Sequence, residues 1–324
     1  MKDKHTHKNK RTHKNKHTHK NKRTHKNKLT HKNKHTQDYN NSKTFKKQTC
    51  GPFKEHPYTC YTTESLIKIK DKWNKKHPHH NTKINSDEPH IIWKKLKKLL
   101  FNVCDNEKCW LRREFMKHYL DQNLLSYTFA PDRPDTWETN NNTWLNSNNI
   151  LSVMKQYEKK YKFFRFIGPS PIDYNKIVNG DCVWNELCKF DLSQYLKKGV
   201  NKIGIIFNTD PHDKDGEHWI ATFIDINSKE PYIFYFDSTG DKISSNINKF
   251  IKNVISQAKS ININLKYIDN HKIVHQKGTT ECGMYCLYFI IQLLTDSKDY
   301  SYFLDKNNKI PDDFVEKYRH IYFN

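Results

Sequence analysis

The pattern of apolar and polar residues changes twice along the chain. Residues 1–45 are polar almost throughout, residues 46–128 place apolar side chains at helical spacing, and residues 129–324 alternate short apolar strands with helices. From these changes we predict a disordered tail over 1–45, a helical arm domain over 46–128 and an α+β domain over 129–324.

Two amphipathic helices are predicted in the arm. The stretch "TTESLIKIKDKWNKK" offers Thr63 as an N-cap ahead of an apolar run. The stretch "DEPHIIWKKLKKLLF" forms an apolar stripe, with lysines opposite, from Ile91, Ile92, Leu96, Leu99 and Leu100. Although "KKLKKLL" is compatible with a helix on a membrane surface, we expect the stripe to pack on the α+β domain. The segment "APDRPDTWETNNNTW" then marks the boundary between the two.

The α+β domain contains four short segments typical of strands. They are "KFFRFIGPSPIDY", "NKIGIIFNTD", "HWIATFIDIN" and "PYIFYFDST". Ile203–Phe207 and Trp219–Ile226 are apolar on both faces, which predicts central strands covered by helices. Helices are expected over Ser245–Ala258 and Cys282–Thr295, with a further strand, "INLKYID", between them.

Positive charge is concentrated in the tail. The formal net charge of the chain is +22, and residues 1–37 alone carry twelve Lys and two Arg against one Asp. The motif "THKNK" recurs there five times with a six-residue period, and only Met1 and Leu29 are apolar. A segment of this composition cannot bury a core, so we expect disorder and non-specific nucleic-acid binding through charge. Its eight histidines offer metal binding as an alternative.

Three features of the sequence bear on location. The N-terminus is polar and lacks a secretory apolar segment. No apolar run reaches the ~18 residues that a membrane span needs. Eight cysteines without a signal peptide predict free thiols in a reducing intracellular compartment. We therefore expect a protein that is neither secreted nor embedded in a membrane.

Four residues together offer the chemistry of a thiol nucleophile. His218 begins a predicted strand and Asp237 ends the next, and the short turn "NSKEP" places both at one edge of the sheet. Cys282 begins an apolar helix, whose N-terminus favours a thiolate. Gln276, six residues earlier, can donate its amide N–H to an oxyanion. We predict Cys282 as nucleophile, His218 as base and Asp237 as the carboxylate that orients it.

Each of these residues also has an ordinary structural interpretation. Alone, Cys282 is typical of a core thiol, His218 of a hydrogen-bonded strand end and Asp237 of a turn. Their order and spacing together favour catalysis. Four other pairs lack a convincing metal-ligand spacing, and no metal is expected at His212/His218, His271/His275, Cys104/Cys109 or Cys182/Cys188. Cys286, one turn beyond Cys282, is expected in the core.

The order His, Asp, Gln-x5-Cys-Gly resembles the adenain/SUMO-protease superfamily of cysteine proteases. Its three motifs are "GEHWIATFID", "FYFDS" and "QKGTTECGMY", and "TWLNSNNILSVM" at 143–154 is similar to the segment that opens the SUMO-protease domain. The loop Gly278–Gly283 departs from the Asn-Gly-x-Asp-Cys-Gly of SUMO proteases. The arm sequence "YTCYTTESLIKIKDKWN" resembles the core proteases of large nucleocytoplasmic DNA viruses, whose layout matches best.

This resemblance implies a papain-like α+β core, a central mixed sheet flanked by helices, with no metal or organic cofactor. It implies a cysteine endopeptidase that cleaves viral structural polyproteins after small residues (Gly-Gly-X), in the virion or a cytoplasmic viral factory. Trp219 and Gly283 are then predicted to bind substrate, with Trp219 as the roof of a narrow slot and plain core packing as its alternative. Three other functions stay open: an isopeptidase removing a ubiquitin-like modifier, an acetyltransferase, or a non-enzymatic nucleic-acid-binding packaging protein.

Overall fold

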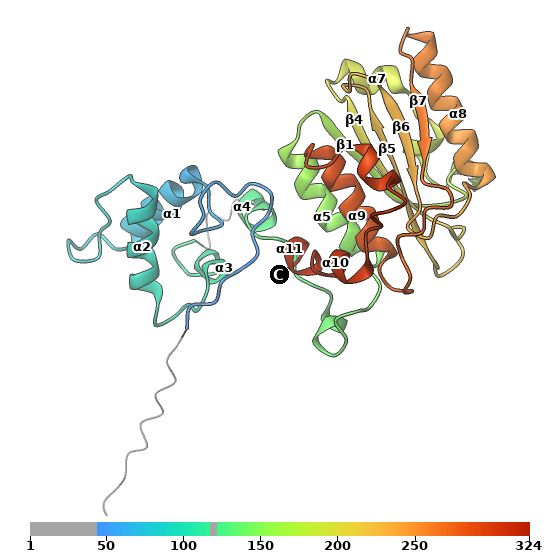
Figure 1. Cartoon of the computed structure of the whole chain (residues 1–324). Coiled ribbons are helices and arrows are strands. Elements are labelled where there is room, and N and C mark those ends of the chain that lie inside the picture. Colours follow the sequence, from blue (N-terminus) through green and yellow to red (C-terminus); the bar gives the residue numbers. More distant parts are fainter. Residues whose placement is uncertain (1–43, 117–121) are drawn as a thin grey trace, which may run out of the picture. The chain divides into compact units, whose positions relative to one another are not determined.

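The computed structural model describes residues 44–116 and 122–324. The predicted disordered tail over 1–45, with its repeats and its expected nucleic-acid and metal contacts, lies almost wholly outside the described residues. Within them, the larger domain is built around one five-stranded sheet (Figure 1).

The sheet is mixed, as predicted. Its spatial order is β1 (Phe164–Pro171), β4 (Lys202–Asn208), β5 (Trp219–Asp225), β6 (Tyr232–Phe236) and β7 (Lys266–Asp269). The pairs β1–β4 and β6–β7 are parallel, whereas β4–β5 and β5–β6 are antiparallel. The expectation that the two continuously apolar segments form central strands is confirmed, because every residue of β5 and nearly every residue of β4 is buried.

Helices cover both faces of the sheet. On one face, α5 (Ser147–Lys160) and α9 (Cys282–Leu294) share a core with Phe223 and Phe234 (Figure 1). On the other face, α7 (Leu192–Lys197) and α8 (Ser245–Ser260) share a core with Ile224 and Ile233. Because side chains alternate along a strand, neighbouring residues of β5 and β6 enter different cores. This explains why these strands read as apolar on both faces.

Short elements complete the larger domain. They are η2 (Asp135–Glu138), β2 (Ile177–Val178), β3 (Asp181–Cys182), α6 (Asn185–Cys188), η3 (Tyr300–Leu304), α10 (Asp312–Glu316) and α11 (Arg319–Tyr322). The strands β2 and β3 form a separate antiparallel hairpin. Among the described helices, none is long and apolar enough to cross a membrane.

The arm contains α1 (Thr63–Lys76), α2 (Pro89–Leu100), α3 (Glu107–Leu111) and α4 (Gln122–Tyr127). The predicted cap is wrong by one residue, because it is the Thr62 side chain that accepts the hydrogen bond from Ser65 N, at 3.1 Å. The cap therefore lies outside the first helical residue, as cap geometry requires.

The apolar stripe of α2 is narrower than predicted and packs elsewhere. Ile92, Leu96 and Leu100 are buried at i, i+4 spacing, whereas Ile91 is 38% exposed and Leu99 is only half-buried. We expected the stripe to pack on the α+β domain, and this expectation is wrong. The stripe packs into the core of the arm, which includes Leu66 and Ile69 of α1. The arm thus buries its apolar face within itself.

The expectation of free thiols is wrong for most of the cysteines. Disulfides join Cys50 to Cys60, Cys104 to Cys109 and Cys182 to Cys188, and only Cys282 and Cys286 are free. The Cα atoms of the three pairs lie 5.0, 5.5 and 6.3 Å apart, within the range that a bridge spans. Disulfide pairing depends on which cysteines lie close together in the fold, and the number of cysteines in the sequence does not reveal this.

Candidate active site

His218 and Asp237 meet at one edge of the sheet, as the sequence predicts. The antiparallel register pairs Ala221 of β5 with Phe236 of β6, so the residue before β5 and the residue after β6 lie at the same end. The Nε2 atom of His218 lies 2.8 Å from Asp237 Oδ1. Asp237 is buried and its partner is partly exposed, so the imidazole presents its other nitrogen away from the carboxylate.

The Asp237 carboxylate is held by its own turn. Asp237 Oδ1 also accepts hydrogen bonds from Thr239 N and Thr239 Oγ1, at 2.9 and 2.7 Å. Asn270, between β7 and α9, fixes the backbone: its Oδ1 accepts from Asp237 N at 2.9 Å, and its Nδ2 donates to Asp237 O at 2.6 Å. Four donors and acceptors therefore fix the position of the group that orients His218.

Cys282 is the first residue of α9 and its thiol is 1% exposed. It lies close enough to His218 to affect the pKa of that imidazole. Burial alone would lower the pKa of His218, but the hydrogen bond to Asp237 and the charges of Asp237 and Cys282 outweigh burial and raise this pKa to about 10. An imidazolium beside a thiol at a helix N-terminus stabilises the thiolate, which is the reactive form.

Gln276 is buried, with its side-chain amide oriented by two hydrogen bonds. Its Oε1 accepts from Ser238 Oγ at 2.7 Å, and its Nε2 donates to Gly278 O at 2.8 Å. The backbone N–H of Gln276 donates to Ser238 O at 2.9 Å. A side-chain amide has two N–H groups, so one N–H of Gln276 is engaged by Gly278 and the amide cannot flip without losing both contacts.

Trp219 and Gly283 pack against each other and against Leu145. The Trp219 indole donates from Nε1 to Leu145 O at 2.8 Å. A Cβ on Gly283 would lie 3.1 Å from Leu145 Cβ and 3.3 Å from Trp219 Cδ1, so the close approach leaves little space for a side chain. Trp219 belongs both to the core and to the wall of a cleft of about 630 Å³. The two predicted roles of Trp219 are thus compatible.

The other histidines and cysteines considered from the sequence have structural partners. His212 Nδ1 lies 2.7 Å from Asp173 Oδ2, and His271 Nδ1 lies 3.2 Å from Gly240 O. His275 is buried between two backbone groups, Phe303 O and Ile310 N. Within 44–116 and 122–324, His, Cys, Asp and Glu side chains form no group of three that could hold a metal ion. Burial in the core raises the pKa of Cys286 well above its usual value.

Comparison with known proteins places this chain in a family. Residues 117–322 match the Ulp1 protease family, C-terminal catalytic domain. The chain belongs to this family. It is a thiol protease, and the resemblance to the adenain/SUMO-protease superfamily is confirmed.

The relatives of this Ulp1-family protease include proteins of large DNA viruses. A protein of Acanthamoeba polyphaga mimivirus, named as a thiol protease, is 28% identical over 270 residues, covering 76% of this chain and 84% of that protein. A cysteine protease of African swine fever virus is 28% identical over 225 residues, covering 67% of this chain and 81% of that one. The same viral protein is named a SUMO-1 cysteine protease in another isolate.

The crystal structure of the African swine fever virus protease has the same fold. It superposes with a TM-score of 0.60 at 23% identity, covering 86% of this chain and 96% of that one. The predicted core, a mixed sheet flanked by helices, is thus shared with a solved protease.

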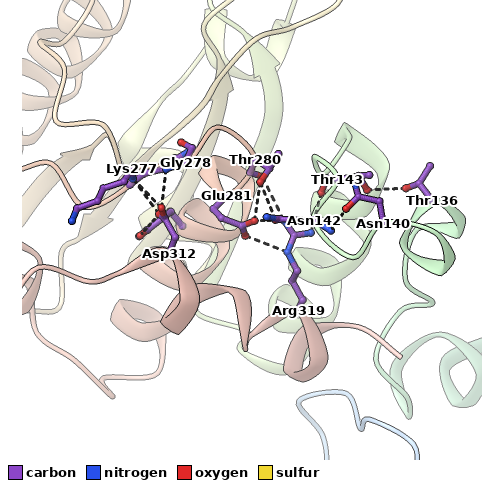
Figure 2. A network of polar contacts seen from close by, with 12 residues as sticks. Thr136, Asn140, Asn142, Thr143, Lys277, Gly278, Thr280, Glu281, Asp312 and Arg319 are labelled. Carbon is purple, nitrogen blue, oxygen red and sulfur yellow. Dashed lines mark hydrogen bonds and ion pairs between the residues drawn. The ribbon is translucent and has the colours of Figure 1, made fainter.

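Sequence reasoning missed three residues that contact the segment between Gln276 and Cys282. Figure 2 shows two of them, Asp312 and Arg319, which reach this segment from the C-terminal part of the chain. The third, Ser238, follows Asp237 directly and holds Gln276. The only sequence signal for Ser238 is its adjacency to Asp237, and neither Asp312 nor Arg319 has a local signal, because each contact spans more than thirty residues.

Proposed function

We propose that this Ulp1-family protease is a cysteine endopeptidase with a Cys282–His218–Asp237 triad, which cleaves viral structural polyproteins after small residues (Gly-Gly-X). The observation that carries the proposal is the 2.8 Å contact of His218 with Asp237, on an imidazole whose pKa is raised by Asp237 and by the neighbouring Cys282. The proposed base thus contacts its orienting carboxylate and lies near the proposed nucleophile, an arrangement that supports the triad mechanism.

The reaction follows from these contacts. The Cys282 thiolate attacks the scissile carbonyl carbon, and the His218 imidazolium donates its proton to the leaving amine. A water then attacks the acyl-enzyme and gives its proton to His218, and the Cys282–acyl bond breaks, which releases the acid and regenerates the thiolate and the imidazolium. Asp237 holds the imidazole in place throughout. The second N–H of Gln276 Nε2 and the backbone N–H of Cys282 stabilise the oxyanion, each contributing about 3 kcal/mol.

The preference for small residues rests on the packing of Trp219 over Gly283. A hydrogen bond to Leu145 O holds Trp219, which directly follows His218 in the chain, and this fixed indole is proposed to exclude larger side chains from the site that precedes the scissile bond. Peptides with Gly-Gly or Gly-Ala before the bond should be cleaved, and matched peptides with Leu or Lys there should not. Trp219→Ala should relax this choice, with Trp144→Ala, on the same cleft but half-exposed, as the matched control. Preference of the wild type for a bulky residue would contradict the proposal.

An isopeptidase is the second candidate, because relatives carry the name SUMO-1 cysteine protease. Both activities use the same chemistry and differ in what occupies the outer cleft. We would compare hydrolysis of a short Gly-Gly peptide with hydrolysis of a full-length ubiquitin-like protein carrying the same C-terminal reporter. An endopeptidase should cleave both at similar kcat/KM. A gain of about 10²-fold or more for the folded modifier would favour the isopeptidase.

The proposed place of action is the virion or a cytoplasmic viral factory. The support is that the relatives named above come from large DNA viruses. The highly basic residues 1–37 are proposed to bind nucleic acid there through charge. Immunoblotting of purified virions against soluble infected-cell extract tests the location, and absence from both virions and factories would refute it.

A further inference from the structure

The loop that carries Gln276 and leads to Cys282, residues 275–281, is held at three points by the segment 303–319 from the C-terminal part of the chain. The first point is His275, which is buried. Its Nδ1 accepts from Ile310 N at 3.1 Å, so its proton lies on Nε2, which donates to Phe303 O at 3.0 Å. Backbone groups of Phe303 and Ile310 therefore hold both ring nitrogens of His275, the residue directly before Gln276.

The second point is Asp312, at the start of α10. Its Oδ2 accepts from Lys277 N and Gly278 N, at 3.0 and 2.8 Å (Figure 2). Its Oδ1 accepts from Tyr285 Oη at 2.9 Å. Gly278 in turn accepts from Gln276 Nε2 through its carbonyl. One carboxylate thus links the amide that faces the oxyanion to Tyr285 in the first turn of α9.

The third point is Arg319, at the start of α11. Its guanidinium forms a two-point ion pair with Glu281, from Nη2 to Oε1 at 2.8 Å and from Nε to Oε2 at 3.2 Å. Only 2% of the Arg319 side chain and 3% of the Glu281 side chain are exposed. Arg319 Nη1 also donates to Thr143 O at 3.0 Å, two residues before the Leu145 that holds Trp219 (Figure 2).

This third contact has an electrostatic consequence. Glu281 directly precedes Cys282, and a free carboxylate there would oppose formation of the thiolate. Pairing with Arg319 neutralises that charge while a planar guanidinium fixes its geometry. The same side chain lies 4.6 Å from the ring centre of Trp137, which encloses it further.

We propose that Asp312 and Arg319 are positioning residues that set the distance and orientation of Gln276 relative to Cys282; this inference rests on the proposed function. Catalytic groups need placement within about 0.5 Å, and a loop containing Gly278 does not hold itself that well. The partly buried Asp312 acts through Gly278, the buried Arg319 acts through Glu281, and neither touches a reacting atom.

The test separates positioning from mere stabilisation. Asp312→Ala and Arg319→Lys are compared with wild type in three measurements: kcat and KM on a cleaved Gly-Gly peptide, the rate of iodoacetamide alkylation at Cys282, and Tm. Alkylation needs the thiolate but no oxyanion donor. We expect kcat to fall about 10- to 100-fold in both variants. KM and the alkylation rate of Asp312→Ala should stay within about threefold of wild type.

The matched control is Lys202→Met combined with Asp225→Asn. This removes another buried ion pair of the same domain, at the opposite end of α9. It should lower Tm and leave kcat within about twofold. If Asp312→Ala and Arg319→Lys keep wild-type kcat, the positioning role is overturned. It is also overturned if kcat, the alkylation rate and Tm fall together in these variants and in the control double variant. Neither outcome affects the proposed function. Wild-type alkylation at Cys282 no faster than at Cys286 overturns the proposed function and the positioning role with it.

Discussion

Helix α9 has a buried ion pair at each end, and the two ends differ in what the pair supports. At the N-terminal end, Arg319 pairs with Glu281 beside the thiol of Cys282. At the C-terminal end, Lys202 lies 3.4 Å from Asp225 and donates to Leu293 O, the last turn of the helix. The cation at the C-terminal end complements the helix dipole directly.

The comparison shows that burial of charge does not by itself mark a functional site. The C-terminal pair satisfies the helix and the start of β4, and Lys202 also pairs with the exposed Asp296 just beyond the helix. In the proposed mechanism, the N-terminal pair leaves the positive end of the helix dipole to Cys282, because the carboxylate of Glu281 is already paired with Arg319. Under the proposed function, the orientation of the helix dipole and not the presence of an ion pair distinguishes the catalytic end of α9.

The largest expected effect contrasts Cys282 with a second thiol one turn further along α9. Cys282→Ala should reduce kcat by about 10³-fold or more, and His218→Ala nearly as much, because nucleophile and base act as a unit. Cys286→Ala, which removes a buried core thiol, should leave kcat within about twofold. Turnover of a Gly-Gly peptide measures all three. If Cys282→Ala kept a tenth of the rate, another residue would be the nucleophile.

The next effect concerns the oxyanion. Gln276→Ala should lower kcat about 10²-fold with little change in KM, since the lost donor acts in the transition state. Ser238→Ala should cost about tenfold, because Gln276 loses the contact that orients its Oε1. Steady-state kinetics at several substrate concentrations separates the two constants. A change in KM alone would remove Gln276 from the oxyanion hole.

A smaller effect is expected from Asp237→Asn, measured as the pH dependence of kcat/KM. The pKa of His218 is raised to about 10, so the imidazolium needed by the leaving amine is lost only as the pH rises through that value. Removing the charge of Asp237 should move the alkaline limb to lower pH and cost about tenfold at neutral pH, leaving measurable activity. An alkaline limb that did not move would show that Asp237 leaves the charge of His218 unaffected.

The opposite end of α9 should respond in stability and not in turnover. Lys202→Met leaves Asp225 buried without its cation, which should lower the free energy of unfolding by about 3–5 kcal/mol. The value of kcat should stay within about twofold of wild type. Chemical denaturation and peptide turnover on the same preparation provide both numbers. A loss of kcat as large as that of Gln276→Ala would erase the distinction between the two ends.

The smallest effect on turnover is expected from the repeat region, which lies outside the described residues. Deleting residues 2–37 should leave kcat/KM on a neutral peptide within about a factor of two, because the repeats lack apolar anchors. The deletion should weaken nucleic-acid binding and flatten its dependence on salt. Binding isotherms at several salt concentrations, with and without these residues, decide the second point. An inactive truncated enzyme would contradict the first.

Local patterns predicted much of this molecule. The strands β4 and β5 followed from continuous apolar runs, and α9 followed from one apolar segment after Cys282. The meeting of His218 with Asp237 was predictable because a short turn joins β5 to β6, so two residues at the strand ends must be neighbours. In each case residues that are close in the sequence determine the local structure.

The contacts that the sequence did not predict depend on the folded chain. Ser238 meets Gln276 across 38 residues, and Arg319 meets Thr143 across 176. No periodicity connects such positions. The prediction of free thiols was wrong for a related reason. It was inferred from the number of cysteines and the expected compartment, whereas disulfide pairing depends on which cysteines the fold brings close together. The Thr62 cap and the narrow stripe of α2 show that element boundaries and exact faces also need the packed structure.

The position of Arg319 in the chain has a consequence for the timing of activity during synthesis. A ribosome makes Glu281 before Arg319, and the two are separated by 38 residues. At about 5–20 residues per second, the growing polypeptide contains its nucleophile for roughly 2–8 s before the partner of Glu281 exists. During that interval the carboxylate of Glu281, next to Cys282, has no Arg319 to pair with, and the loop 275–281 lacks the third of its three contacts with the C-terminal segment. The nascent chain should therefore be a weaker protease toward proteins emerging from neighbouring ribosomes, and full turnover would require that Arg319 has been added and packed.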